Sequence, residues 1–185
     1  MASMIRSATT SDARSIAEIH VSAWRAAYQG ILPEGYLNRF SVEKREQIWK
    51  GACEQDDSDL LVATTRSEVV GFCHLTPSRD QDSEDAGEIT SIYLAPEQKR
   101  RGLGRALVEA SLALASAQGF ERITLWVLVE NLPARQFYEA LGFRPDGMLK
   151  EETDGDVCLR EMRYQIRVNE ALQRTLIPTS VLASA

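Results

Sequence analysis

The chain has 185 residues, of which 44% are hydrophobic and 26% are charged, and its formal net charge is −6. This length and apolar content suit one domain with a substantial core, and the negative charge argues against nucleic acid as a partner. No apolar run reaches the length of a membrane span and the N-terminus lacks the apolar block of a signal peptide, so we expect a cytoplasmic protein without membrane association.

The first half of the chain predicts a strand, two helices and a β-hairpin. The expected elements are a strand over 4–9, helices over 9–30 and 41–54, and strands over 59–66 and 68–76. Gly30 is a suitable stop for the first helix, and Ser41 is a suitable N-cap for the second. The two β-rich runs are separated by a very short connection, which favours a hairpin.

The second half alternates strands and helices. The expected elements are strands over 88–95, 122–129 and 157–166, a helix from Leu103 to Gly119, and a short helix over 131–142. Apolar residues at helical spacing define the long helix, and glycine ends both helices. The layout predicts an α+β fold with a mostly antiparallel sheet, formed by a single domain over 1–168, followed by a disordered tail over 169–185.

A basic, glycine-bearing turn, QKRRGLGRAL, lies between the strand ending near residue 95 and the long helix. The first turn of a helix presents free N–H groups and a partial positive charge. Glycines allow a ligand to approach the backbone closely. The combination favours a phosphate or pyrophosphate site, and the alternative is a solvated basic helix face. The turn lacks the order of a Walker loop, and Leu107 replaces the third small residue of a dinucleotide fingerprint, so a nucleotide-dependent enzyme is disfavoured.

The segment IYLAPEQKRRGLGRALV resembles the coenzyme A motif of the GNAT acetyltransferases, with Lys99 in place of the family's Arg or Gln at the first position. The segment ENLPARQFYEALGFR resembles the family's downstream motif, and the two motifs follow in the family's order. The resemblance implies a GNAT-type sheet of about seven strands, flanked by helices, in which strands four and five splay apart. It also implies acetyl-CoA as cosubstrate, with its pantetheine arm pairing like an added strand.

The resemblance assigns the coenzyme to one set of residues. They are the backbone of Ile92, Tyr93 and Leu94, the turn Lys99, Arg100, Arg101, Gly102, Leu103, Gly104 and Arg105, and the side chains of Asn131, Arg135 and Tyr138. Asn131 is equally suited to be a helix N-cap before Pro133. Arg135 has two interpretations, a contact to a coenzyme phosphate or simple surface exposure.

Acetyl transfer to an amine needs a base, stabilisation of the oxyanion and help for the departing thiolate. Tyr138 matches the family's acid near the sulfur, and the alternative is a core tyrosine beside Phe137. Glu88 matches the glutamate base of the histone-acetylating branch, either directly or through water, and the alternative is a charge at a strand edge. Trp126 occupies the place of another branch's glutamate base, and His74 is a weaker candidate base.

The acceptor is expected to be a primary amine of a small molecule or peptide. Its pocket is expected to include Trp24, Tyr28 and Glu88, and the two aromatic residues are equally suited to the core. Two acidic stretches suggest a cationic acceptor, although solvated loops are the alternative. They comprise Asp80, Asp82, Glu84 and Asp85, and Glu151, Glu152, Asp154 and Asp156. The family also allows a homodimer.

The three cysteines are scattered and the chain has only two histidines, so we expect free thiols and no metal site.

The function expected from the resemblance is an acetyl-CoA-dependent N-acetyltransferase that uses direct attack in a ternary complex. The alternative is a non-catalytic coenzyme A-binding module or sensor, which the release of free thiol in the presence of amines would distinguish.

Overall fold

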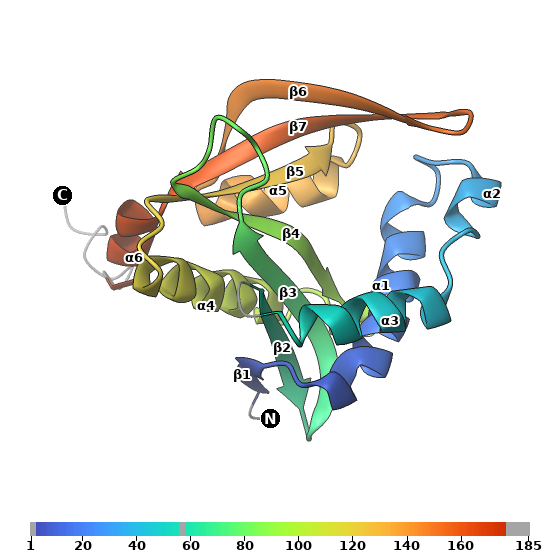
Figure 1. The fold of residues 1–185 in the computed structure, drawn as a ribbon, viewed down its shortest axis with the longest axis horizontal. Helices are drawn as coiled ribbons and strands as arrows, with labels where there is room; N and C mark the ends of the chain where they lie inside the picture. Colours follow the sequence, from blue (N-terminus) through green and yellow to red (C-terminus); the bar gives the residue numbers. More distant parts are fainter. Residues whose placement is uncertain (1–2, 56–57, 177–185) are drawn as a thin grey trace.

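The computed structural model describes residues 3–55 and 58–176, and within them seven strands form one sheet (Figure 1). The strands are β1 (Ser3–Ser7), β2 (Asp59–Thr65), β3 (Glu68–Pro77), β4 (Ala86–Leu94), β5 (Arg122–Leu128), β6 (Arg144–Asp154) and β7 (Val157–Arg167). Their order is β1-β2-β3-β4-β5-β7-β6, and only the β4–β5 pair is parallel. The predicted sheet, mostly antiparallel and of about seven strands, is confirmed.

Helices cover both faces of this sheet. They are α1 (Ala13–Tyr28), α2 (Glu34–Leu37), α3 (Val42–Ala52), α4 (Leu103–Ala117), α5 (Leu132–Leu141) and α6 (Val168–Leu176), with 3₁₀ turns at Thr10–Asp12 and Pro96–Gln98. One core cluster joins α1 and α3 to β2 and β3, and a larger one joins α4, α5 and α6 to the opposite face. Among the described residues, no helix is both long enough and apolar enough to cross a membrane.

Local sequence rules explain several boundaries. Ser41 caps α3 as predicted, because its hydroxyl accepts a hydrogen bond of 3.3 Å from the Lys44 amide. The β2–β3 hairpin turns at Arg66 and Ser67, whose φ angles are 52° and 70°. Two successive positive φ values are the backbone of a type I′ turn, which matches the twist of the flanking strands. The predicted hairpin is therefore confirmed.

Three elements differ from the sequence-based expectation. The one-turn helix α2 and the strand β6 were not predicted at all. Strand β6 is an edge strand that pairs with β7 alone and is exposed along most of its length. The expected disordered tail over 169–185 is wrong for its first part, since α6 continues to Leu176 and buries Ala171 in the core. Residues 177–185 lie outside the described part of the chain.

The parallel strands β4 and β5 pair over only three residues. The pairs are Ala86–Arg122, Gly87–Ile123 and Glu88–Thr124. Beyond Glu88 both strands continue, β4 to Leu94 and β5 to Leu128, with no pairing between them in the described structure. β4 also carries an irregularity here, because Ser91 pairs with His74 whereas Ile89 pairs with Leu75, which leaves Thr90 as an extra residue. The predicted splay between strands four and five is confirmed.

Candidate active site

Glu88 occupies the last β4–β5 pair, where the two strands begin to separate. Its side chain is 2% exposed and lies against Arg79 of the β3–β4 loop. The Arg79 Nε and backbone amide donate to Oε2 of Glu88 over 3.1 and 3.2 Å, and Nη2 donates to Oε1. The alternative of a solvated charge at a strand edge is therefore wrong. Oε1 accepts one recorded hydrogen bond, which leaves lone-pair capacity for a water or an amine.

The free edge of β4 lies beyond Glu88. Ile92, Tyr93 and Leu94 pair with Cys73, Phe72 and Gly71 of β3 along one edge. Their other edge has no strand partner among the described residues. Unpaired backbone groups at a strand edge are what an extended ligand needs in order to add to a sheet.

The basic turn stands beside the end of β4. Gly102 has a φ of +81°, and a Cβ placed on it would meet no atom within 4 Å. Arg100 also has a positive φ, 63°. Since α4 starts at Leu103, its first amide groups lack intrahelical acceptors. Lys99, Arg100 and Arg101 are exposed, and no salt bridge to another described residue is recorded for them. The turn thus presents amides and cations toward open space.

Gly104 serves a different purpose from Gly102. A Cβ at this position would lie 3.1 Å from the Phe137 ring and 3.6 Å from Leu94. This glycine therefore lets α4 approach α5 and the end of β4 closely, rather than leaving room for a ligand. The contact brings the turn to the open end of the gap between β4 and β5.

Tyr138 on α5 is 9% exposed and packs beside Phe137, Phe143 and Tyr164. Burial, together with the nearby Tyr28, raises the pKa of Tyr138 well above its usual range. The phenol therefore holds its proton at neutral pH and acts as a hydrogen-bond donor.

The structure gathers further tyrosines around Tyr138. Burial raises the pKa of Tyr28, an effect that hydrogen bonds from Tyr93 and Asn131 oppose. Burial and the neighbouring Tyr28 and Tyr138 raise the pKa of Tyr93. Four candidate residues from α1, β4, the start of α5 and α5 itself therefore meet at one place. The side chain of Tyr93 was not singled out from the sequence, which pointed only to its backbone.

Trp24 lies beside this group, in a small cluster with Tyr28, Leu37 and Leu128. Its ring stacks on Phe40 at a centroid distance of 4.4 Å and contacts Tyr28 at 4.3 Å. The Trp24 Nε1 atom is buried without a hydrogen-bond partner among the described residues. Trp24 and Tyr28 thus join α1 to the end of β5 in the core, and their place in the acceptor pocket stays a prediction.

Asn131 and Arg135 both make hydrogen bonds within the fold. Asn131 caps α5, since its Oδ1 accepts from the Ala134 amide at 3.3 Å, and it is also close enough to bond Tyr28. Arg135 donates to the Tyr164 hydroxyl and to the Val129 carbonyl. This guanidinium is half-buried and supports the loop after β5. It is therefore neither simply exposed at the surface nor free to bind a phosphate.

His74 and His20 have structural partners. The two ring nitrogens of His74 lie 2.6 Å from Thr90 and 2.8 Å from Ser58, and burial lowers its pKa. His20 accepts a hydrogen bond from Trp49, and burial lowers its pKa to about 3. Both imidazoles are neutral at physiological pH. His74 is therefore a poorer candidate base than Glu88.

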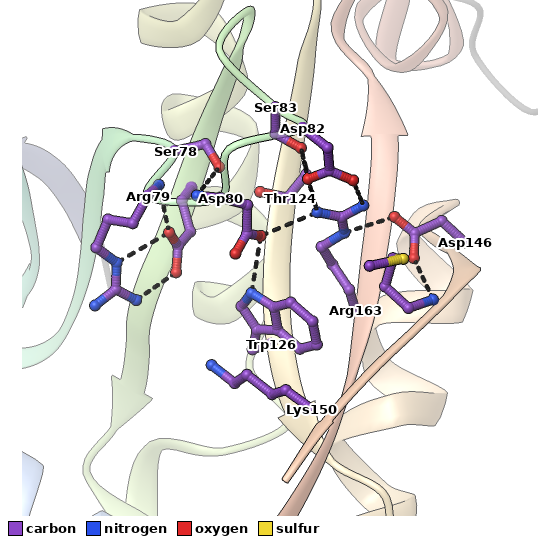
Figure 2. Close-up of polar contacts among 12 residues, drawn as sticks. Ser78, Arg79, Asp80, Asp82, Ser83, Thr124, Trp126, Asp146, Lys150 and Arg163 are labelled. Carbon is purple, nitrogen blue, oxygen red and sulfur yellow. Dashed lines mark hydrogen bonds and ion pairs between the residues drawn. The ribbon is translucent and has the colours of Figure 1, made fainter. Parts of the chain in front are cut away.

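An ionic cluster that the sequence did not reveal lies next to Arg79, the partner of Glu88 (Figure 2). Its centre is Arg163 of β7, whose guanidinium bonds Asp80 and Asp82 of the β3–β4 loop and Asp146 of β6. Trp126 of β5 donates its indole N–H to Asp80 over 3.0 Å. The ammonium of Lys150 lies 4.4 Å from the centre of the Trp126 ring.

Some of the carboxylates expected to attract a cationic acceptor are paired. Besides Asp80 and Asp82, the pairs are Asp85–Arg122, Glu151–Arg160 and Asp154–Arg39. Asp80 and Asp82 share the single guanidinium of Arg163 with Asp146, so three carboxylates surround one cation and the group keeps a net negative charge. The electrostatic attraction of a cationic acceptor stays a prediction.

A family model described as the acetyltransferase (GNAT) family matches residues 14–143. The uncharacterized N-acetyltransferase YuaI of Bacillus subtilis is 32% identical over 136 residues, which cover 74% of this chain and 77% of the relative. A spermidine N(1)-acetyltransferase of Thermoplasma acidophilum is 25% identical over 166 residues, covering 87% of this chain and 97% of that protein.

The fold of this chain also resembles that of a solved N-acetyltransferase. The crystal structure of the PaiA N-acetyltransferase from Thermoplasma acidophilum in complex with coenzyme A superposes with a TM-score of 0.75 at 22% identity. The match covers 90% of this chain and 99% of that one. The fold type expected from the two sequence motifs is confirmed.

Proposed function

Because this chain belongs to the GNAT acetyltransferase family, we propose that it transfers an acetyl group from acetyl-CoA to an amine of a small molecule or peptide. The observation that carries the proposal is the separation of β4 from β5 after Glu88, with the basic turn at the open end of the gap and Tyr138 close to β4. This arrangement offers three groups to an extended molecule of acetyl-CoA. They are a strand edge for the pantetheine arm, an anion site for the pyrophosphate and a phenol for the thioester sulfur.

The donor is held by backbone groups and by charge. The edge of 92–94 pairs with the pantetheine arm. The amides at the start of α4 and the cations of the turn bind the pyrophosphate. The residues proposed for this are Lys99, Arg100, Arg101, Gly102, Leu103 and Arg105, with Asn131 at the pantetheine. Gly104 contributes by keeping the turn close to Phe137.

The chemistry is an attack by the neutral amine on the thioester carbonyl carbon. The amine proton passes to Glu88 through a water, because a carboxylate with a 2% exposed side chain is not open to a bulky acceptor. A carbon–nitrogen bond forms, the carbon–sulfur bond breaks, and coenzyme A leaves as a thiolate. Tyr138 donates a hydrogen bond to that sulfur. Since its phenol is a weaker acid than a thiol, the hydrogen bond itself provides the stabilisation.

The acceptor side lies between Trp24 and Tyr28 on α1 and the aromatic ring of Trp126. The relative named for spermidine supports a small-molecule amine as the acceptor class. The three carboxylates around the one guanidinium of Arg163 leave a negative charge near this side, which is compatible with a cationic amine. We expect shape and local contacts to select among such amines.

Acetyl-CoA should stabilise the protein against heat, and Gly102→Glu should remove this effect. Ligand at one hundred times its Kd contributes about 2.7 kcal/mol, which corresponds to a rise of about 5 to 10 °C in Tm for a chain of this size. A glutamate at residue 102 places negative charge at the expected pyrophosphate position. The measurement is a melting curve with and without acetyl-CoA.

Gly119→Glu provides a matched control for this experiment. Gly119 follows the other end of α4, has a φ of +82°, and also has open space around its missing Cβ. It should show the same intrinsic loss of stability and retain the full coenzyme response. An unmutated protein that gains no stability from acetyl-CoA would refute the proposed donor.

A further inference from the structure

Arg163 ties the β3–β4 loop to the rest of the sheet. Its side chain is 6% exposed, and its Nη1 and Nη2 atoms bind both carboxylate oxygens of Asp82 at 2.7 and 2.8 Å. Nη1 also bonds Asp80 at 3.1 Å, and Nε bonds Asp146 at 2.7 Å. A planar guanidinium can hold several carboxylates in a fixed geometry, whereas a lysine cannot.

The loop that Arg163 holds carries the partner of Glu88. Asp80 is fixed from two sides, by Arg163 and by the Trp126 indole, and Arg79 directly precedes it. Arg79 uses its backbone amide as well as its guanidinium to bind Glu88. A displacement of Asp80 would therefore move both the amide and the side chain that hold the Glu88 carboxylate; Figure 2 shows Asp80 between Arg79 and Arg163.

We propose that Arg163 is a positioning residue for the acetyl transfer: it fixes the β3–β4 loop so that Arg79 orients the Glu88 carboxylate at the point where β4 and β5 separate. The inference rests on the proposed function, in which Glu88 is the base. Arg163 has no recorded contact with Glu88, although its guanidinium lies 5.7 Å from the centre of the Trp126 ring. Its proposed influence on Glu88 passes through Asp80 and Arg79.

A purely structural anchor would have a different effect. A residue that only anchors the loop affects the stability of the whole domain. In a variant of such a residue, the molecules that remain folded would have the normal kcat. A positioning residue changes kcat in the folded enzyme, and it does so only while Arg79 is present. Two measurements separate these cases, and one of them needs no acceptor.

The first measurement follows the Arg79 Nε–H group by ¹⁵N NMR of the full chain. Its signal, assigned by its absence in Arg79→Lys, should have a chemical shift distinct from that of a free arginine in the unmutated protein, because it donates to the buried carboxylate of Glu88. In Arg163→Gln the signal should move to the free-arginine position. In Arg160→Gln it should stay in place, since exposed Arg160 lies on the same strand and pairs with Glu151 instead. An unmoved signal in Arg163→Gln, or a free-arginine shift in the unmutated protein, would overturn the inference even if no acceptor were known.

The second measurement is kinetic, with acetyl-CoA and one amine for all variants. Arg163→Gln should lower kcat by about 10- to 100-fold, as misplacement of a catalytic group does, with the KM for acetyl-CoA changed less than about twofold because the turn at 99–105 is untouched. Arg163→Lys should recover part of the loss. The double variant with Arg79→Gln should be no slower than the slower single variant, because both changes act through one contact.

Asp80→Asn covers the case in which Arg163→Gln does not fold. It keeps the shape of Asp80 and weakens both of its bonds, and it should lower kcat in the same direction. Fully additive losses, or variants with lowered Tm but unchanged kcat, would overturn the positioning role. A complete lack of acetyl transfer by the unmutated protein would instead refute the proposed function, and the NMR result would still decide whether Arg163 places Arg79.

Discussion

Replacing Tyr138 by phenylalanine should lower kcat by about 100-fold or more, as the loss of one preorganised hydrogen-bond donor to a developing negative charge does, while the affinity for acetyl-CoA stays nearly constant. The substitution removes one hydroxyl and keeps the ring packed against Phe137 and Phe143. The hydroxyl acts on the sulfur only as the carbon–sulfur bond breaks, so its loss is felt in the transition state more than in binding.

Tyr164→Phe is the matched control for this prediction. Tyr164 is another fully buried tyrosine, close to Tyr138, and its hydroxyl bonds Glu139 and Arg135 rather than facing the gap between the strands. Its loss should lower stability by about 1 kcal/mol, a typical value for a hydrogen bond, with little change in kcat. A Tyr138→Phe enzyme with normal kcat, measured where chemistry limits the rate, would contradict the role given to this phenol.

Glu88→Gln should also lower kcat by about 100-fold or more, because an amide of the same shape cannot accept the proton of the amine. The change also weakens the bonds from Arg79, because the ion pair is lost and the amide offers one acceptor oxygen in place of two. A fall in Tm is therefore expected together with the fall in kcat, and the two must be measured on the same preparations.

Glu84→Gln separates the loss of the base from the loss of a nearby charge. Glu84 is exposed, lies in the same β3–β4 loop, and has no recorded ion pair with another described residue. This variant should keep kcat and Tm close to those of the unmutated protein. If Glu88→Gln lowers Tm while the folded enzyme keeps its kcat, Glu88 is only the structural partner of Arg79.

The elements that carry the donor site could be predicted because their signals are local. Glycine at a helix start, an N-cap such as Ser41, and apolar residues at a fixed spacing act within a few residues of each other. The two motifs around Gly102 and Tyr138 are likewise continuous in sequence. The sheet of about seven strands and the splay between strands four and five then follow from the family resemblance, and the structure confirms them.

The elements that were missed have no such local signal. Strand β6 contains Pro145 and Gly147 and a run of charged residues, all unfavourable for strands, and it is held by pairing with β7. The cluster around Arg163 joins residues as far apart as Asp80 and Arg163, so no sequence spacing reveals it. Distance along the chain likewise hid the ion pairs of Asp85 with Arg122 and of Asp154 with Arg39.

The most direct test of the central proposal is a transfer assay that counts both products. The purified chain is incubated with acetyl-CoA and single amines, among them spermidine, a zwitterionic amino acid and a peptide with a free N-terminus. Free thiol and acetylated amine are then quantified, and Tyr138→Phe is run in parallel. We predict that at least one amine is acetylated, with one thiol released for each acetyl group transferred and a much lower rate in the variant. Binding of acetyl-CoA without an acetylated product from any amine would contradict the account and would favour a coenzyme A-binding module without catalysis.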